Sequence, residues 1–380
     1  MTRLRHALLG AAAAAVFGAG VAEAKQLRFA IGWPPNSIAH DAVETYASVA
    51  EEASGGELTV RVFPLSLLNF MEATSGVRDG IADITTILTP YFLAEFPRSN
   101  LLSELAALIE LQEDAGPKAP MAFVGAITEY HMLHCPACVE EYAAQNHVYT
   151  AGASSPSYIF QCVTPIRTSE DLVGKRIRTG GAFWARWIQE MGATPVTLSA
   201  NETFEALSQG VVDCTTNSAS DLSNFSFIDV VSHLQLDVPG SIFASSISSM
   251  NRDTWRSLTP DQRTAAMRAG AALASHMTWN YWEEGIRNVE RSRERGIEVL
   301  SASDELLAKS REFIARDLDG IVDLYKTRNG IADAQEVADA MRELVAKWTP
   351  LVADVETADE LAEIYWNEIH SKIDVNSYGL

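Results

Sequence analysis

The pattern of hydrophobic and polar residues over the first ninety positions alternates between strands and helices. Predicted strands at residues 26–33, 57–64 and 81–88 are separated by predicted helices over 39–53 and 72–80. Apolar side chains recur at helical spacing in the first of these helices, whereas they alternate with polar ones or run continuously in the strands. The order β-α-β-α-β is typical of a lobe built on a parallel sheet.

Residues 157–217 repeat this alternation and predict a second α/β lobe. Within it, residues 171–217 read as strand, helix, strand, helix, strand, with Arg178 ending the first strand and Asn217 ending the last. Ligands of open parallel sheets bind outside the carboxyl ends of the strands, so we expect both side chains to face one crevice. An arginine there without catalytic companions favours a carboxylate clamp over a reaction centre.

The remaining pattern is mostly helical. Residues 101–145 and 303–375 show amphipathic helical spacing, and a long helix is predicted to start after Ser257 or Thr259 and to end near Gly296. A helix of roughly 35 residues spans about 50 Å, which is more than one lobe needs. We therefore expect it to bridge both lobes.

The N-terminus has the features of a secretory signal peptide. Arg3 and Arg5 precede a short apolar run, and an A-x-A cleavage site ends at Ala24. Residues 1–24 are predicted to be removed, and the run is too short and too rich in alanine and glycine for a membrane anchor, which is the alternative. The expected location of the protein is the periplasm.

The length of the chain predicts two domains, because a single core stops growing at about 250–300 residues. We expect lobe I to contain residues 25–155 and about 241–280. Lobe II is expected to contain residues 156–240 and about 281–380, including the helical C-terminal region.

The charge of the chain limits its partners. The formal net charge is −21, with 50 acidic and 29 basic residues. Such an acidic protein is a poor partner for nucleic acid or for an anionic membrane. An anionic ligand would need a local positive site, which directs attention to Arg178.

The segment around Arg178 resembles a known family signature. The signature runs as D-L-x-G-x-x-x-R, then G-A-x-P-V, then E-x-x-x-A-L-x-x-G-x-V-D. Its members here are Asp171, Leu172, Gly174, Arg178, Gly192, Ala193, Pro195, Val196, Glu202, Ala206, Leu207, Gly210, Val212 and Asp213. This pattern is similar to that of DctP-type periplasmic substrate-binding proteins of TRAP (tripartite ATP-independent periplasmic) transporters, and the resemblance covers most of residues 26–245.

The resemblance implies an α/β, two-lobed, type II-like periplasmic binding protein fold and a function in transport. Family members bind an organic anion between the lobes, close by hinge motion and deliver the anion to the membrane subunits of the transporter. The protein would then be a receptor rather than an enzyme and would need no cofactor. A monomer is expected, with a dimer as the alternative.

The resemblance also assigns roles to individual residues. Arg178 falls on the family arginine, whose planar fork matches a carboxylate, and Asn217 falls on a pocket asparagine. The structural alternatives are an Arg178 paired with Asp171, Glu202 or another structural carboxylate, and an Asn217 that serves as a helix cap or in a turn.

Two departures from the family pattern bear on the ligand. Tyr158 stands where many relatives have a second arginine, and Ala200 stands where many have an aromatic residue. One positive charge fewer favours a monocarboxylate, and a smaller side chain leaves room for a bulkier one.

Other candidate ligand-binding residues lie near predicted strand ends and loops. They are Trp33, Asn36, Phe70, Thr89, Tyr91, Phe183 and Trp184. Each aromatic residue alone is more often part of a core. Together the five aromatics favour a partly apolar ligand, such as an aromatic or branched acid.

The four cysteines predict at least one disulfide in an exported protein. They lie at positions 135, 138, 162 and 214, and the sequence does not choose among their three possible full pairings. His131, His134, Cys135 and Cys138 resemble a zinc knuckle in isolation, which is the minor alternative. We expect no metal site.

Other functions are less well supported by the sequence. A receptor for an ATP-driven importer or a chemosensor would share the fold, and only residues 171–217 separate it from the TRAP class. An exported hydrolase is a distant alternative, because the G-x-S-x-G, H-E-x-x-H and Walker motifs are absent. A scaffold protein without a ligand would not need the crevice of Arg178 and Asn217.

Overall fold

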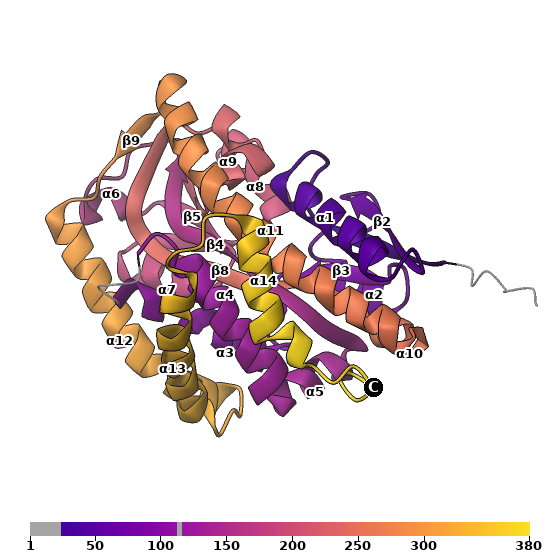
Figure 1. Ribbon diagram of the computed structural model, residues 1–380. Coiled ribbons are helices and arrows are strands. Elements are labelled where there is room, and N and C mark those ends of the chain that lie inside the picture. The colour runs from indigo at the N-terminus through magenta and orange to yellow at the C-terminus, as the bar shows by residue number, and fades with distance from the viewer. Residues whose placement is uncertain (1–23, 112–115) are drawn as a thin grey trace, which may run out of the picture.

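The computed structural model describes residues 24–111 and 116–380. These residues form a nine-stranded mixed sheet in the order β2-β1-β3-β8-β4-β7-β5-β6, with β9 paired to β8 (Figure 1). The predicted signal peptide, apart from its last residue, lies outside the described residues. No helix in the described ranges is long and apolar enough to cross a membrane.

One end of the sheet is built from the first ninety residues. Strand β1 (Lys25–Ile31) lies parallel to β2 (Leu58–Pro64) and to β3 (Ile84–Ile87). The connecting helices are α1 (Ile38–Ala53) and α2 (Ala73–Arg78). The predicted β-α-β-α-β order is confirmed.

The opposite end of the sheet is built from residues 169–217. Strand β5 (Arg176–Thr179) lies parallel to β6 (Thr194–Thr197) and to β7 (Cys214–Asn217). Three helices accompany them: α6 (Ser169–Leu172), α7 (Ala182–Glu190) and α8 (Ala200–Ser208). The predicted second α/β unit is also confirmed.

Two long antiparallel strands join these ends. Strand β4 (His147–Cys162) pairs with β8 (His233–Asn251) along most of its length, and the register shifts several times between Tyr149 and Phe160. The predicted lobe boundaries at 155/156 and 240/241 fall inside these strands. Both strands therefore contribute to both lobes, and the boundaries remain a prediction.

Helix α11 (Pro260–Glu294) is the predicted long helix and crosses both ends of the sheet (Figure 1). The Thr259 hydroxyl and the Gln262 side chain form a capping box at its start, with Pro260 in the first turn. Gly296 follows its end with a φ of 79°, a conformation that costs glycine little. The helix packs against α1, β4 and α14.

The other elements complete the hydrophobic core. Near β8 the chain also forms α10 (Arg252–Ser257) and β9 (Glu298–Leu300), and α9 (Asp221–Asn224) packs against α11. The remaining helices are α3 (Pro97–Glu104), α4 (Ala119–Glu129), α5 (Pro136–Ala144), α12 (Asp304–Arg328), α13 (Ala334–Val352) and α14 (Ala358–Glu368). Short turns of 3₁₀ helix occur at Thr89–Tyr91, Leu105–Leu111, Phe227–Asp229 and His370–Lys372, and a π-helical segment at Tyr130–His134.

All four cysteines are paired, as Cys135–Cys138 and Cys162–Cys214. The first pair opens α5, and the second joins the end of β4 to the start of β7. The prediction of at least one disulfide is confirmed. Because Cys135 and Cys138 are bonded to each other, they cannot supply the thiolate ligands of a zinc knuckle.

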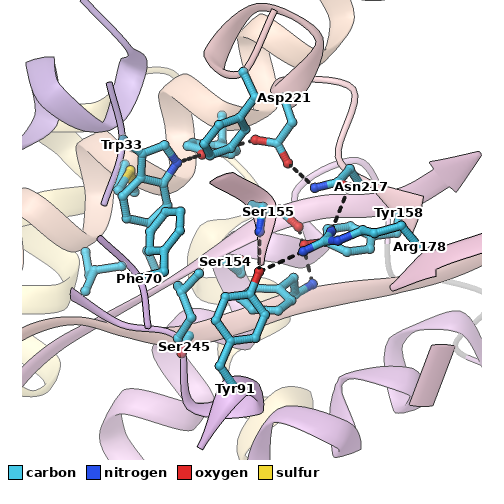
Figure 2. A pocket seen from close by; sticks show the side chains of 18 residues that line it. Trp33, Phe70, Tyr91, Ser154, Ser155, Tyr158, Arg178, Asn217, Asp221 and Ser245 are labelled. Carbon is cyan, nitrogen blue, oxygen red and sulfur yellow. Dashed lines mark hydrogen bonds between the residues drawn. The ribbon is translucent and has the colours of Figure 1, made fainter. Parts of the chain in front are cut away.

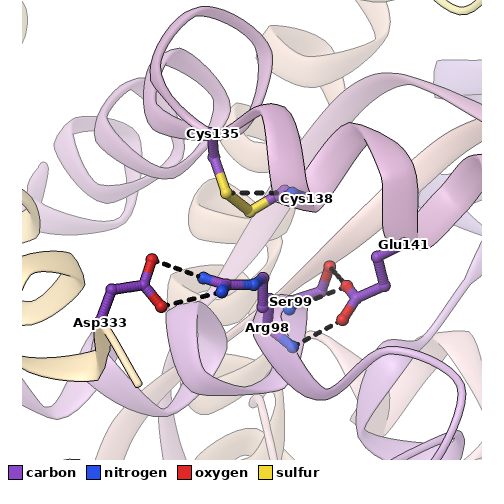
Figure 3. Close-up of a disulfide and its surroundings, with 6 residues drawn as sticks. All are labelled: Arg98, Ser99, Cys135, Cys138, Glu141 and Asp333. Carbon is purple, nitrogen blue, oxygen red and sulfur yellow. Dashed lines mark hydrogen bonds and ion pairs between the residues drawn. A yellow bond between two sulfur atoms is a disulfide. The ribbon is translucent and has the colours of Figure 1, made fainter. Parts of the chain in front are cut away.

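The Cys135–Cys138 disulfide lies beside a polar cluster that ties three helices together (Figure 3). The Glu141 carboxylate on α5 accepts hydrogen bonds from the backbone N–H groups of Arg98 and Ser99 at the start of α3, at 2.6 and 3.1 Å. The Arg98 guanidinium donates two bonds to Asp333, which precedes α13. The cluster thus has a structural role, because each charged group has a partner within the protein.

Candidate ligand-binding site

A cavity lies between the two ends of the sheet, at the carboxyl ends of β1, β3, β5 and β7 (Figure 2). It offers about 60 Å³ to water-sized spheres, which is room for roughly four to six water molecules. Its lining consists of Trp33, Phe70, Leu88, Tyr91, Ala153, Ser154, Ser155, Tyr158, Arg178, Ala200, Asn217, Asp221, Phe225, Phe243, Ser245, Ile247, Met277 and Tyr281.

Arg178 supplies the positive charge of this cavity. Its side chain is almost fully buried, with only 1% of the residue surface exposed. Nε donates to the Leu198 carbonyl at 3.0 Å, Nη1 to Asn217 Oδ1 at 2.9 Å, and Nη2 to the Tyr91 hydroxyl at 2.7 Å. The guanidinium is thereby held in one orientation between β5, β7 and the turn after β3.

Asp171 and Glu202 do not pair with Arg178, because both carboxylates serve as helix caps. Asp171 accepts from the backbone N–H groups of Arg167 and Thr168. Glu202 accepts from the backbone N–H of Ser199. The cavity therefore contains a buried guanidinium that neither of these carboxylates neutralises.

The second charged group in the lining is Asp221, which the sequence reasoning missed. Its Oδ2 accepts from Asn217 Nδ2 at 2.9 Å, and its Oδ1 accepts from the Tyr281 hydroxyl at 3.3 Å. Tyr281 in turn accepts from Trp33 Nε1 at 2.6 Å. Burial raises the pKa of the Asp221 carboxyl from 3.8 to about 6, although hydrogen bonds and the charge of Arg178 oppose the rise.

Asn217 connects these two charged groups. Its amide oxygen accepts from Arg178 and its amide nitrogen donates to Asp221, so both ends of the amide are engaged. The alternative of an asparagine that only caps a turn therefore does not hold. Figure 2 shows the resulting chain of polar side chains along one side of the cavity.

Aromatic rings form much of the remaining wall. The rings of Trp33 and Phe70 meet edge to face at 4.6 Å, and Tyr158 stacks on Phe243 at 5.7 Å. Ala200 lies in the wall as a small residue. Apolar surface of this kind binds the hydrocarbon part of a ligand, while polar groups orient it.

Six of the ten predicted site residues line the cavity. They are Trp33, Phe70, Tyr91, Tyr158, Arg178 and Asn217. The structure brings them together from the carboxyl ends of β1, β3, β5 and β7, from the loop between β2 and α2, and from β4.

The other four predicted site residues, Asn36, Thr89, Phe183 and Trp184, lie outside this lining. Trp184 stacks behind Tyr158 at 4.5 Å and donates to the Gly240 carbonyl, and Phe183 packs against Phe313. Thr89 donates its backbone N–H to the Ser245 hydroxyl below the surface of the cavity. Asn36 is exposed in the turn after β1, where its φ is 62°.

The lining residues that sequence reasoning missed lie mainly on β4, β8 and α11. They include Ser154, Ser155, Phe243, Ser245, Ile247, Met277 and Tyr281. Nothing in the local pattern marked them, because β4 and β8 are buried on both faces near the cavity and show no alternation. Asp221 carried a weak signal, since it lies one helical turn after Asn217.

A two-lobed fold that surrounds a largely apolar cavity, with one fixed guanidinium in the wall, is that of a solute-binding protein. A comparison with known sequence families identifies which family of solute-binding proteins this is. Residues 29–323 match the bacterial extracellular solute-binding protein family 7, DctP, and the chain belongs to this family. Its members and structural neighbours are solute-binding proteins rather than enzymes.

Individual relatives are distant. A solute-binding protein of Sulfitobacter sp. is 26% identical over 366 residues, which cover 89% of this chain and 98% of the relative. An uncharacterized protein of Salmonella typhimurium is 25% identical over 233 residues, and the match spans 59% of this chain and 65% of that protein, just under two thirds.

Solved structures of TRAP solute-binding proteins share the fold. The Bordetella bronchiseptica protein with bound mandelate has a TM-score of 0.71 and 22% identity, covering 85% of this chain and 99% of that one. A marine metagenome protein in complex with pyroglutamate has a TM-score of 0.70 and 19% identity, covering 84% and 99%.

Proposed function

We propose that this protein is a periplasmic receptor that binds an organic monocarboxylate between its two lobes and delivers it to the membrane subunits of a TRAP transporter. Family membership supports the receptor role, and the predicted signal peptide supports the location. We further propose that the receptor acts as a monomer and that its lobes divide as the sequence predicts. An ATP-driven importer or a chemosensor is the alternative partner, and the family match argues against both.

The observation that carries the proposal is the environment of Arg178. A buried guanidinium lines an apolar cavity beside the Asn217 amide and the Tyr91 hydroxyl, so an entering carboxylate would meet all three groups together. Hydrogen bonds between a guanidinium and a carboxylate are charge-assisted and have a defined geometry. We propose Arg178 as the carboxylate anchor and Asn217 as its neighbour in the site.

The absence of a second cation supports a monocarboxylate. Tyr158, where many relatives have arginine, packs against the rings of Trp184 and Phe243, which also stack on each other. Arg178 is the only Lys or Arg in the cavity lining, which consists of described residues. A second carboxylate would therefore be buried without a positive partner, at considerable cost.

The apolar wall supports a small acid with an aromatic or branched body. The neighbours bound to mandelate and pyroglutamate are receptors for compact monocarboxylates, which agrees in kind with the aromatic lining of this cavity. Mandelate and pyroglutamate are therefore the compounds with which a ligand screen should begin.

The test is isothermal calorimetry on an Arg178→Ala variant. A thermal-shift screen of aliphatic, aromatic, hydroxy and keto acids first identifies ligands of the wild-type protein, since a ligand of the folded state raises its melting temperature. Loss of two charge-assisted bonds should then weaken binding by at least about 100-fold. Unchanged affinity would overturn the assignment of Arg178.

Arg176→Ala is the matched control. Arg176 lies two residues earlier on the same strand, and its exposed guanidinium pairs with Asp213. This variant should retain the wild-type affinity. If only compounds without a carboxylate stabilise the wild type, the organic-acid proposal fails as a whole.

A further inference from the structure

Asp221 is the feature that a receptor for a simple carboxylate does not explain. The residue is 5% exposed and belongs to the cavity lining, so its carboxyl group lies in the same enclosed space as a bound anion. At neutral pH it would repel that anion. A carboxylate in this position favours binding only if the ligand supplies a group that interacts favourably with it.

The hydrogen bonds of Asp221 leave it with spare accepting capacity. A carboxylate has roughly four lone-pair sites. Asn217 Nδ2 and the Tyr281 hydroxyl occupy two of them, and the Asn224 side chain lies close enough to act on a third. An ionised carboxylate cannot donate, so the group that it can still accommodate is a hydrogen-bond donor.

The distance between the two charged groups restricts where that donor can be. One amide group, that of Asn217, spans the gap between Arg178 Nη1 and Asp221 Oδ2, with a contact of 2.9 Å at each end. Since an amide is about 2.3 Å wide, the two atoms lie within about 8 Å of each other. Figure 2 shows both side chains on the same side of the cavity.

A donor on the carbon next to the ligand carboxylate fits this distance. The carboxylate oxygen and the donor atom would be about 3 Å apart, and with a hydrogen bond of about 2.8 Å at each end the path spans up to about 8.5 Å. A donor several carbons further along would overshoot Asp221 and enter the aromatic wall.

We propose that the site selects organic acids that carry a hydrogen-bond donor on carbon 2, a hydroxyl, amino or amide N–H group, and that Asp221 accepts this hydrogen bond while Arg178 holds the carboxylate. This inference rests on the proposed function and narrows its substrate class. Trp33 and Tyr281 have a positioning role, because the Trp33–Tyr281–Asp221 bonds hold the Asp221 carboxyl group in place.

The test compares acids that differ only at carbon 2, at pH 8. One series is 2-hydroxy-3-methylbutanoate, 2-amino-3-methylbutanoate, 3-methyl-2-oxobutanoate and 3-methylbutanoate, and a second series has the same groups on 3-phenylpropanoate. The hydroxy or amino acid should bind the wild type at least 10-fold more tightly than the unsubstituted and oxo acids, because one hydrogen bond to a charged group is gained. The oxo group only accepts, so it should not satisfy Asp221.

Asp221→Asn separates recognition from a merely structural role. This variant keeps the size of the side chain and removes its charge. The preference for the donor should fall below about 3-fold, and the unsubstituted acid should bind at least as tightly as it binds the wild type. A variant that was only structurally damaged would lose affinity for every acid alike.

The outcomes distinguish this inference from the proposed function. Equal affinity of the wild type for acids with and without the donor, or an unchanged preference in Asp221→Asn, overturns the role of Asp221 and leaves the receptor proposal intact. Failure of the wild type to bind any of the acids counts against the receptor proposal itself.

Discussion

Asp221 should make the stability of the protein depend on pH in a direction that is unusual for a carboxylate. Its pKa is about 6 in the folded protein, against 3.8 for the unperturbed group, and the principal cause is burial. Between these two values the folded state binds more protons than the unfolded state. The free energy of unfolding contributed by this group therefore falls as the pH rises from 4 to 6, and it is constant above that range.

The size of the effect follows from the shift in pKa. Each unit is worth about 1.4 kcal/mol, so ionised Asp221 should destabilise the fold by about 3 kcal/mol at pH 7. Asp221→Asn removes the titration. The variant should therefore gain about 2.4 kcal/mol of stability relative to the wild type between pH 4 and pH 7, because part of the full effect has already developed at pH 4; any constant offset from the substitution itself leaves this difference unchanged.

Urea unfolding of both proteins at half-unit intervals from pH 4 to pH 8, without added ligand, measures this difference. Subtracting the two curves cancels the contributions of all other titrating groups. The tyrosines that face Asp221 do not interfere, since burial raises the pKa values of Tyr158 and Tyr281 well above 10. A difference that is independent of pH, or one that shrinks as the pH rises, would refute the reasoning.

Two further predictions concern stability away from the cavity. Replacing both Cys162 and Cys214 by alanine should lower the free energy of unfolding by about 4 kcal/mol, because this disulfide closes a loop with a sequence separation of 52. The same change at Cys135 and Cys138, with a separation of 3, should lower it by about 2 kcal/mol. Equal losses in urea unfolding would contradict this ranking. Burial lowers the pKa of His131 from 6.5 to about 3, so its contribution to stability is complete above pH 6.5 and falls as the pH decreases. His131→Phe should therefore lose about 2 kcal/mol less stability than the wild type between pH 7.5 and pH 5, and equal losses in the two proteins would disprove the assignment.

The sequence alone was enough to predict the site residues that lie at the ends of strands. Arg178 and Asn217 end strands of a predicted parallel sheet, and the general position of ligands in such sheets placed them together without any knowledge of packing. The capped start of α11 was equally local, because Thr259, Pro260 and Gln262 are adjacent in sequence.

The rest of the site depends on packing that no local pattern reports. Trp184 was predicted to face the ligand, yet it lies one layer behind, where Tyr158 covers it. Ser245 and Tyr281 reach the cavity because β8 and α11 run past it, and their neighbours in sequence are buried in the same way. Only the assembled sheet distinguishes a wall residue from a core residue there.

Three of the chain segments that pass between the two ends of the sheet also limit how the cavity can open. Strands β4 and β8 form a hydrogen-bonded ribbon, and α11 is a continuous rod of 35 residues that packs against both β4 and α1. A ribbon resists bending in its own plane and stretches little, while a rod on one side blocks twisting. We expect these segments to restrict how the two lobes move relative to each other, so that opening of the cavity follows a reproducible path.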